Sequence, residues 1–286
     1  MILPSHPHRR RDEILSTWIL RIASGNVVSV FDLCKWLNID YPHELDSFKP
    51  DHPGIDSLAE AFGVQREVII QALPSSLYGL DRSWGLLNRS PHYCPICLHE
   101  SGHYQVSWTC AIYCCCVRHR CFLRDSCPHC GKPVRDASQR FRLRVSNPTK
   151  ELQQCVYCGR SLLDCENSEM ANDQTVKLTK ILDLLVRNPD CGGFFAVLDR
   201  LLHTMRSQSA FAFQLRSRLL PNLRIESRRR GATLGDFSFL KAKSRALMIQ
   251  AVVSLFAHWP DNGPAYPRSL TRIQLVSFTT APIHGA

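Results

Sequence analysis

The chain has 286 residues, 44% of them hydrophobic, which suffices for about two packed domains. No apolar run approaches the ~18–20 residues of a membrane span, and the N-terminus lacks the apolar core of a secretory signal, so we expect a cytoplasmic protein without membrane contact. The net charge of +10 is concentrated: residues 118–144 hold eight Lys or Arg against two Asp or Glu, and residues 199–245 hold eleven against three. Such clustering is typical of proteins that bind polyanions, although a solvated face gives the same pattern.

Two helices are predicted near the N-terminus. Over residues 13–23, apolar side chains recur every fourth position, which places Trp18 in the core, and Asp12 is a candidate cap. A similar pattern over residues 30–37 predicts a second helix with Cys34 as a small buried residue.

A helix-turn-helix is predicted over residues 57–73. Ser57 and Glu60 form a capping box that opens a short helix, Gly63 suits the positive φ of the turn, and a second helix follows over residues 66–73. A plain packed helical pair explains the same pattern. If the motif reads DNA, the candidate contacts on its second helix are Gln65, Arg66 and Gln71.

Helical patterns resume after a polar linker at residues 166–173. They cover residues 177–186, 194–205, 209–220 and 243–258. Three consecutive arginines lie in a predicted loop and are candidate contacts to nucleic-acid phosphates: Arg228, Arg229 and Arg230. The predicted fold is therefore mainly α, with a helix-turn-helix-like region (1–92), a central double zinc module with short strands (93–165) and a basic C-terminal helical domain (166–286).

The central module is predicted from four ligand pairs with identical spacing. The pairs are Cys94 and Cys97, Cys116 and His119, Cys127 and Cys130, and Cys155 and Cys158. Two residues between ligands allow a tight turn to aim both side chains at one ion, and structural zinc takes four such ligands. The pattern favours two Zn²⁺ ions per chain over disulfides. Sequential pairing of the pairs needs the shorter loops, and cross-brace pairing stays open.

The pattern leaves one ligand with alternatives and argues against catalysis. Cys114 or Cys115 could take the place of Cys116, but only Cys116 gives two residues before His119. Four protein ligands leave no open position for a reacting water, and no phosphate loop or nucleophile elbow occurs in the sequence, so we expect no enzyme. A zinc-dependent nucleic-acid hydrolase is the rival enzyme interpretation.

Two segments carry a resemblance to the TniQ/TnsD family. The first is the opening with Leu3-Pro4, Pro7 and the run from Asp12 to Ala23; the second is Tyr93-Cys94-Pro95-Ile96-Cys97, then Tyr104, Trp108, Cys116, His119, Leu123 and Cys127-Pro128-His129-Cys130-Gly131. Residues 1–165 resemble the family well, and the later half does so loosely. The Cys114-Cys115-Cys116 run departs from the family pattern.

The resemblance implies an accessory protein of DNA transposition. Such proteins select the insertion target and recruit an AAA+ ATPase, either by binding a DNA site or by riding on an RNA-guided CRISPR effector complex; the sequence does not decide between these modes. The arginines flanking the family-like opening are candidate partner contacts: Arg9, Arg10, Arg11 and Arg21. The adaptor mode is compatible with a homodimer, and the alternative is a DNA-binding regulator acting through residues 57–73.

Overall fold

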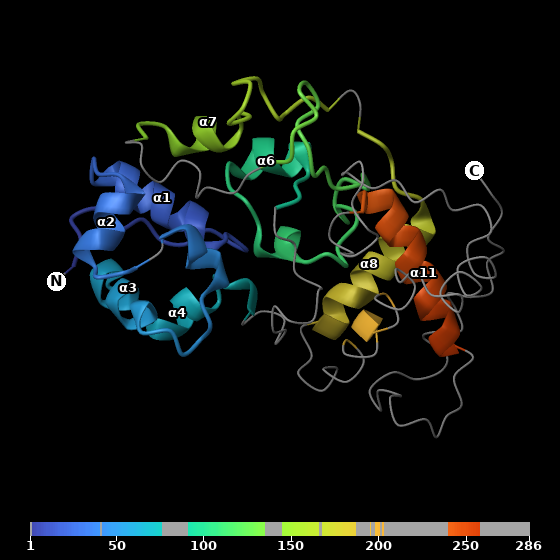
Figure 1. The fold of residues 1–286 in the computed structure, drawn as a ribbon, viewed down its shortest axis with the longest axis horizontal. Coiled ribbons are helices and arrows are strands. Elements are labelled where there is room, and N and C mark those ends of the chain that lie inside the picture. Colours follow the sequence, from blue (N-terminus) through green and yellow to red (C-terminus); the bar gives the residue numbers. More distant parts are fainter. Residues whose placement is uncertain are drawn as a thin grey trace. The chain divides into compact units, whose positions relative to one another are not determined.

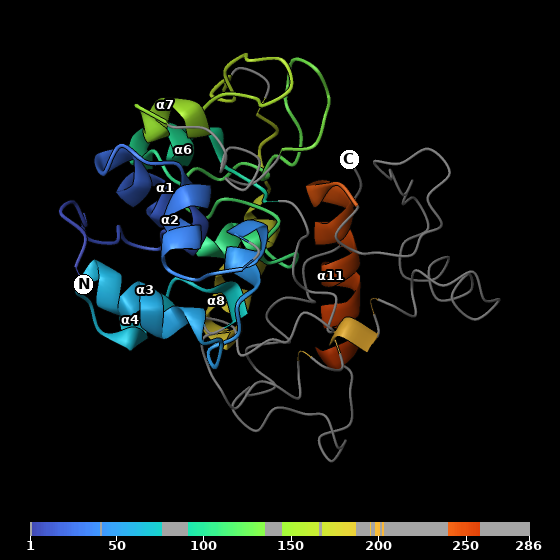
Figure 2. The ribbon, with the colours of Figure 1, turned by 60° about the vertical axis from the view of Figure 1, so that its left-hand side comes forward.

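The computed structural model describes residues 2–40, 42–75, 91–134, 145–165, 168–186 and 240–257, together with residues 195, 198–200 and 202 (Figures 1 and 2). Over this part of the chain the protein is mainly helical, as predicted, and the β-structure consists of isolated bridges. The helices are α1 (Leu15–Gly25), α2 (Val30–Trp36), η1 (Pro42–Ser47), α3 (Gly54–Phe62), α4 (Arg66–Ile70), α6 (Pro95–Ser101), η3 (Val106–Thr109), α7 (Pro148–Leu152), α8 (Asp173–Val186) and α11 (Ala242–Ala257).

The described residues form two compact units. The first unit holds the described residues within 2–75, 91–110 and 123–168, and the second holds those within 111–122 and 169–257. The predicted helix over 209–220 and the loop with Arg228, Arg229 and Arg230 lie outside the described residues.

The core of the first unit is built around α1. Trp18 is 1% exposed, its ring meets Phe62 edge-on at 5.3 Å, and its indole N–H donates to the carbonyl of Pro7 at 2.8 Å. The prediction that Trp18 is a core residue is confirmed. The segment that precedes α1, residues 2–14, is the N-terminal arm. It packs on this unit, because the Leu3 N–H donates to the carbonyl of Ala61 at 2.9 Å.

Asp12 does not cap α1, contrary to the prediction. The cap position is Ile14, and Asp12 adopts a positive φ of 56°. The reason is tertiary: Glu13 forms an isolated antiparallel bridge with Gln105, and this pairing sets how the chain enters the helix.

Helices α3 and α4 lie side by side and are joined at Gly63 (Figures 1 and 2). Gly63 has φ of 62°, the left-handed conformation predicted for the turn. The first helix begins at Gly54 rather than at Ser57, because Pro53 already holds helical backbone angles. The second helix ends at Ile70, three residues before the predicted end.

The second unit contains α8 and α11, which correspond to the predicted helices 177–186 and 243–258. The α8 helix starts earlier than predicted, at Asp173, since the Asn172 side chain accepts from the Thr175 N–H at 2.9 Å. The Gln250 amide donates to the Thr175 hydroxyl at 3.0 Å and joins the two helices. Arg245 is fully buried and donates to the carbonyl of Ala111 at 2.8 Å.

Candidate metal centres

Four cysteines of two tight turns come together in the first unit. The sulfurs of Cys127, Cys130, Cys155 and Cys158 all lie within 4.8 Å of one another. Cys127 Sγ is 3.7 Å from Cys158 Sγ, and Cys130 Sγ is 3.7 Å from Cys155 Sγ. Cys127 and Cys155 are buried, whereas Cys158 is exposed, so the cluster lies at the surface with one side closed by protein.

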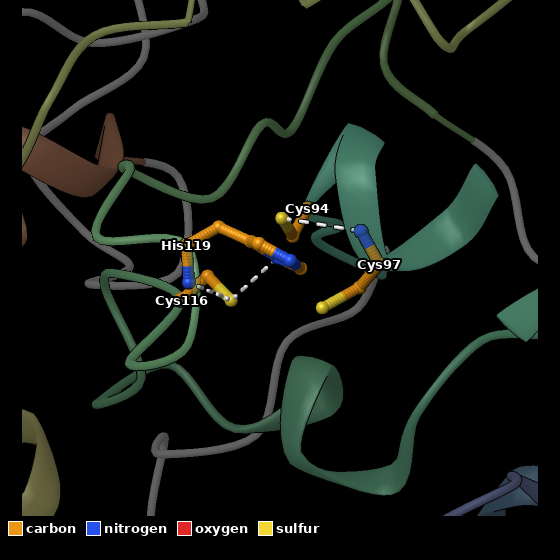
Figure 3. Close-up of side chains that lie close together, drawn as sticks. All are labelled: Cys94, Cys97, Cys116 and His119. Atoms are coloured by element: carbon orange, nitrogen blue, oxygen red, sulfur yellow. Dashed lines mark hydrogen bonds between the residues drawn. The ribbon is translucent and has the colours of Figure 1, made fainter. Parts of the chain in front are cut away.

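A second group of four side chains has the same compactness. The ligand atoms of Cys94, Cys97, Cys116 and His119 lie within 4.8 Å of one another, and Figure 3 shows the thiols and the imidazole pointing into one shared space. Cys94 caps the N-terminus of α6, where its sulfur accepts from the Cys97 N–H at 3.5 Å. The Cys116 sulfur lies 3.5 Å from His119 Nδ1.

Both groups fit a tetrahedral ion with soft ligands. With Zn–S of about 2.3 Å and Zn–N of about 2.05 Å, the edges of a tetrahedron would be about 3.8 Å between two sulfurs and about 3.6 Å between sulfur and nitrogen. The observed separations of 3.7 Å and 3.5 Å agree with these edges. The two clusters can therefore bind metal ions, and their membership follows the sequential grouping of the ligand pairs.

Three of the ligand pairs lie on turns with the same backbone pattern. The fourth residue after the first cysteine donates its N–H to that cysteine's carbonyl, at 2.7 Å for Arg120, 2.9 Å for Gly131 and 2.8 Å for Gly159. These three residues have positive φ of 55°, 67° and 69°. The shared conformation places both ligand side chains on one side of each turn, and glycine adopts it without steric cost.

The other two thiols of the Cys114-Cys115-Cys116 run make contacts outside the cluster. The Cys115 sulfur lies 3.2 Å from the Thr179 hydroxyl, and Cys114 directs its sulfur toward the carbonyl of Ile112 at 3.6 Å. Burial raises the pKa of Cys114 to about 12. Cys116 is thus the member of the run that reaches the cluster.

Ionisation of the four-cysteine cluster is uneven without a cation. Burial raises the pKa of Cys127 to about 12. Burial also opposes ionisation of Cys155, yet its pKa is lowered to about 7 because the backbone N–H groups of Cys158 and Tyr157 donate to its sulfur. Four thiolates at this spacing need a cation between them, so metal binding displaces protons from the cluster.

The four arginines expected to meet a partner have different surroundings. Arg21 donates to both carboxylate oxygens of the buried Glu13, at 2.8 and 2.7 Å. Arg9 donates to the carbonyls of Glu13 and Gln71, and Arg10 donates to the carbonyl of Ser101 at 2.7 Å. The Arg11 side chain is 95% exposed.

The structure also places the three candidate DNA contacts, which lie on α4 and at its two ends. Gln65 and Gln71 are exposed, and Arg66 is half-buried. The Arg66 guanidinium forms an ion pair with Asp56 and donates to the carbonyl of Pro50 at 2.6 Å. The one basic side chain of the three is thereby tied to α3 and to the loop before it.

Sequence reasoning missed two features that the structure makes visible. Glu13 is fully buried beneath Arg21, which its place in an amphipathic helix pattern does not predict. Lys132 lies over the ring of Tyr157, with its Nζ 4.7 Å from the ring centroid, at the tips of two ligand turns. Two sequence signals could have predicted this contact: the aromatic Tyr157 between Cys155 and Cys158, and the basic Lys132 directly after Gly131.

The fold and the clusters define a mainly helical protein with two Cys/His metal-binding modules. The TniQ family model matches residues 4–123, a region that includes α1 to α4 and the whole cluster of Cys94, Cys97, Cys116 and His119. The match confirms the predicted resemblance over residues 4–123, and a TniQ domain implies an association with transposition. No curated protein matches the chain. Among the described residues, no helix has the length and apolar character to cross a bilayer.

Proposed function

We propose that this protein selects the target site in DNA transposition by bridging a target-recognition element to an AAA+ ATPase. The observation that carries the proposal is the TniQ match over residues 4–123, because the accessory proteins of that family act in transposition without chemistry of their own. The recognition element we favour is an RNA-guided CRISPR effector complex.

The chemistry of the clusters supports an adaptor. Each cluster offers four protein ligands, three cysteines with His119 in one and four cysteines in the other. Catalytic zinc sites keep one position for water, whereas four protein ligands saturate a tetrahedral ion. We propose that both ions are Zn²⁺ and that they supply folding energy to the turns that hold them.

Arg11 is the favoured contact for the ATPase. Arg9, Arg10 and Arg21 direct their guanidinium groups to acceptors within the first unit, whereas the Arg11 side chain is 95% exposed, with its Nε 3.9 Å from the Asp12 carboxylate. An exposed guanidinium is suited to bidentate contact with a carboxylate of a partner.

The alternative is a site-specific DNA-binding protein that reads its site through residues 57–73. The ties of Arg66 to Asp56 and to Pro50 leave Gln65 and Gln71 as the exposed candidates for base contact. Arg228, Arg229 and Arg230 serve either mode, because phosphate contacts exist both in duplex DNA and in a guide RNA.

The decisive experiment is capture of an AAA+ transposition ATPase on the tagged full-length chain, with and without the effector complex. Arg11→Glu should weaken capture, whereas Lys49→Glu, a matched reversal at another exposed cation, should not. Point changes are used because Leu3, Arg9 and Arg10 make internal hydrogen bonds, so removing the arm would damage the unit. Failure of the parent protein to capture the ATPase would overturn the proposal.

A second measurement separates the two modes of target choice. Binding to the effector complex should weaken steeply with salt, and reversing the charges of Arg228, Arg229 and Arg230 should lower both affinity and salt slope. Tight sequence-specific binding to duplex DNA by the protein alone, lost on changing Gln65 and Gln71 to Ala, would favour the alternative.

A further inference from the structure

The ligand turns of the four-cysteine cluster expose a group of side chains that metal binding does not explain. They lie between and just after the ligands of the two turns and are His129, Lys132, Val156, Tyr157 and Arg160. Tyr157 and Val156 are 42% and 38% exposed. We call these five residues the turn-tip surface.

Contacts across the two turns hold the turn-tip surface in one arrangement. Lys132 Nζ lies 4.7 Å from the centroid of the Tyr157 ring, which fixes a cation beside an aromatic face. His129 Nε2 lies 3.0 Å from the carbonyl of Ser161, which joins the first turn to the residue after the second. An exposed ring held in place loses little conformational freedom when a ligand stacks on it.

The two turns that carry the turn-tip surface contain cationic side chains and no acidic ones. Residues 126–134 and 155–163 contain no Asp or Glu; of the two adjoining acidic residues, Asp125 is buried and Asp164 is half-buried. A metal-loaded cluster of four thiolates is itself anionic, and Lys132 and Arg160 offset it.

We propose that the turn-tip surface binds single-stranded nucleic acid. An unpaired base stacks on Tyr157 while Lys132 and Arg160 contact the flanking phosphates, which is the combination of aromatic platform and cations that single strands require. A double helix does not offer an unstacked base, so duplex DNA gains only the phosphate contacts. The inference does not depend on the proposed function, and its test uses the purified full-length protein alone.

The test is fluorescence anisotropy with a labelled 30-nucleotide oligo-dT over a range of salt concentrations. Tyr157→Leu should weaken binding about tenfold, because it removes one stacking platform, whereas Tyr157→Phe keeps the ring and should bind like the parent. Lys132→Gln and Arg160→Gln should each reduce the salt slope by about 0.7. Lys180→Gln, a change of the same charge at an exposed residue of α8, should leave the slope unchanged.

A second readout keeps the inference testable if Tyr157→Leu loses metal. Tyr157→Trp should keep its metal, and its added indole fluorescence, measured against the parent with its five Trp, should be quenched by the oligonucleotide. The inference is overturned if the parent fails to bind oligo-dT, if metal-replete Tyr157→Leu binds at parental affinity, or if the added fluorescence of Tyr157→Trp is not quenched.

Discussion

Arg21 donates two hydrogen bonds to the carboxylate of Glu13, at 2.8 and 2.7 Å, and the Glu13 side chain is fully buried. The backbone N–H of Arg10 also donates to this carboxylate at 2.9 Å. The pair therefore fastens the N-terminal arm to α1. Both residues lie in the TniQ region, where the arginine has a structural role that its sequence position alone does not reveal.

Removing Arg21 should destabilise the protein more than an exposed arginine would. Arg21→Met leaves the Glu13 carboxylate buried without its cation, which costs about 3–5 kcal/mol. Denaturant unfolding of the metal-loaded protein measures the loss. The double variant with Glu13→Gln should recover a large part of it, and Arg11→Met, at a side chain 95% exposed, should change stability little. Equal losses for Arg21→Met and Arg11→Met would contradict the buried-pair argument.

Metal content should be two zinc ions per chain. Cys158→Ser should reduce it to one, because the serine oxygen is a poor ligand for the cation that holds the other three thiolates. Cys97→Ser should also leave one zinc ion per chain, because it removes a ligand of the other cluster. Elemental analysis of purified protein with zinc quantified per chain gives the answer, and Cys165→Ser, at an exposed cysteine outside both clusters, is the control. A folded parent with one zinc or none would be inconsistent with two sites.

The glycines of the ligand turns should be sensitive to substitution for a backbone reason alone. A Cβ built on Gly159 meets no atom within 4 Å, so the cost of Gly159→Ala comes from its φ of 69° and should be about 1 kcal/mol. Arg120 holds the equivalent position with φ of 55°. Competition with a chelator measures the change as a several-fold weaker zinc affinity. A drop of more than about a hundredfold would mean that the side-chain environment, rather than φ, sets the cost.

Alkaline pH should lower stability through Cys34. Burial raises its pKa from 9.0 to about 12 in the folded protein. Above pH 9 the folded state keeps a proton that the unfolded chain has lost. The contribution of the protonated Cys34 thiol to the free energy of unfolding is therefore fully present below pH 9 and is lost as pH rises toward 12. The slope should approach about 1.4 kcal/mol per pH unit between about pH 10 and 11. Unfolding of parent and Cys34→Ala between pH 7 and 10.5 gives the difference, and parallel curves would refute the effect.

Local patterns in the sequence predicted α1, α2, α3, α4, α8, α11 and the ligand sets, whereas α6 and α7 of the central module were not predicted. Apolar periodicity indicated α1, α2, α8 and α11 because one face of each is buried. Fixed spacing predicted which cysteines turn toward a metal, because a short turn can satisfy only one geometry. Gly63 likewise predicted the turn between α3 and α4, because the φ of 62° at this position disfavours residues other than glycine.

Only the tertiary structure decided how these local elements are used. Asp12 lost its predicted capping role because Glu13 pairs with Gln105, which is distant in sequence. Arg21 became an internal partner because α1 buries Glu13 beneath it, and Lys132 met Tyr157 because the cluster draws two separate turns together. Side-chain spacing along the chain determines faces and turns, whereas contacts across distant segments depend on the packing of the whole unit and leave no local signature.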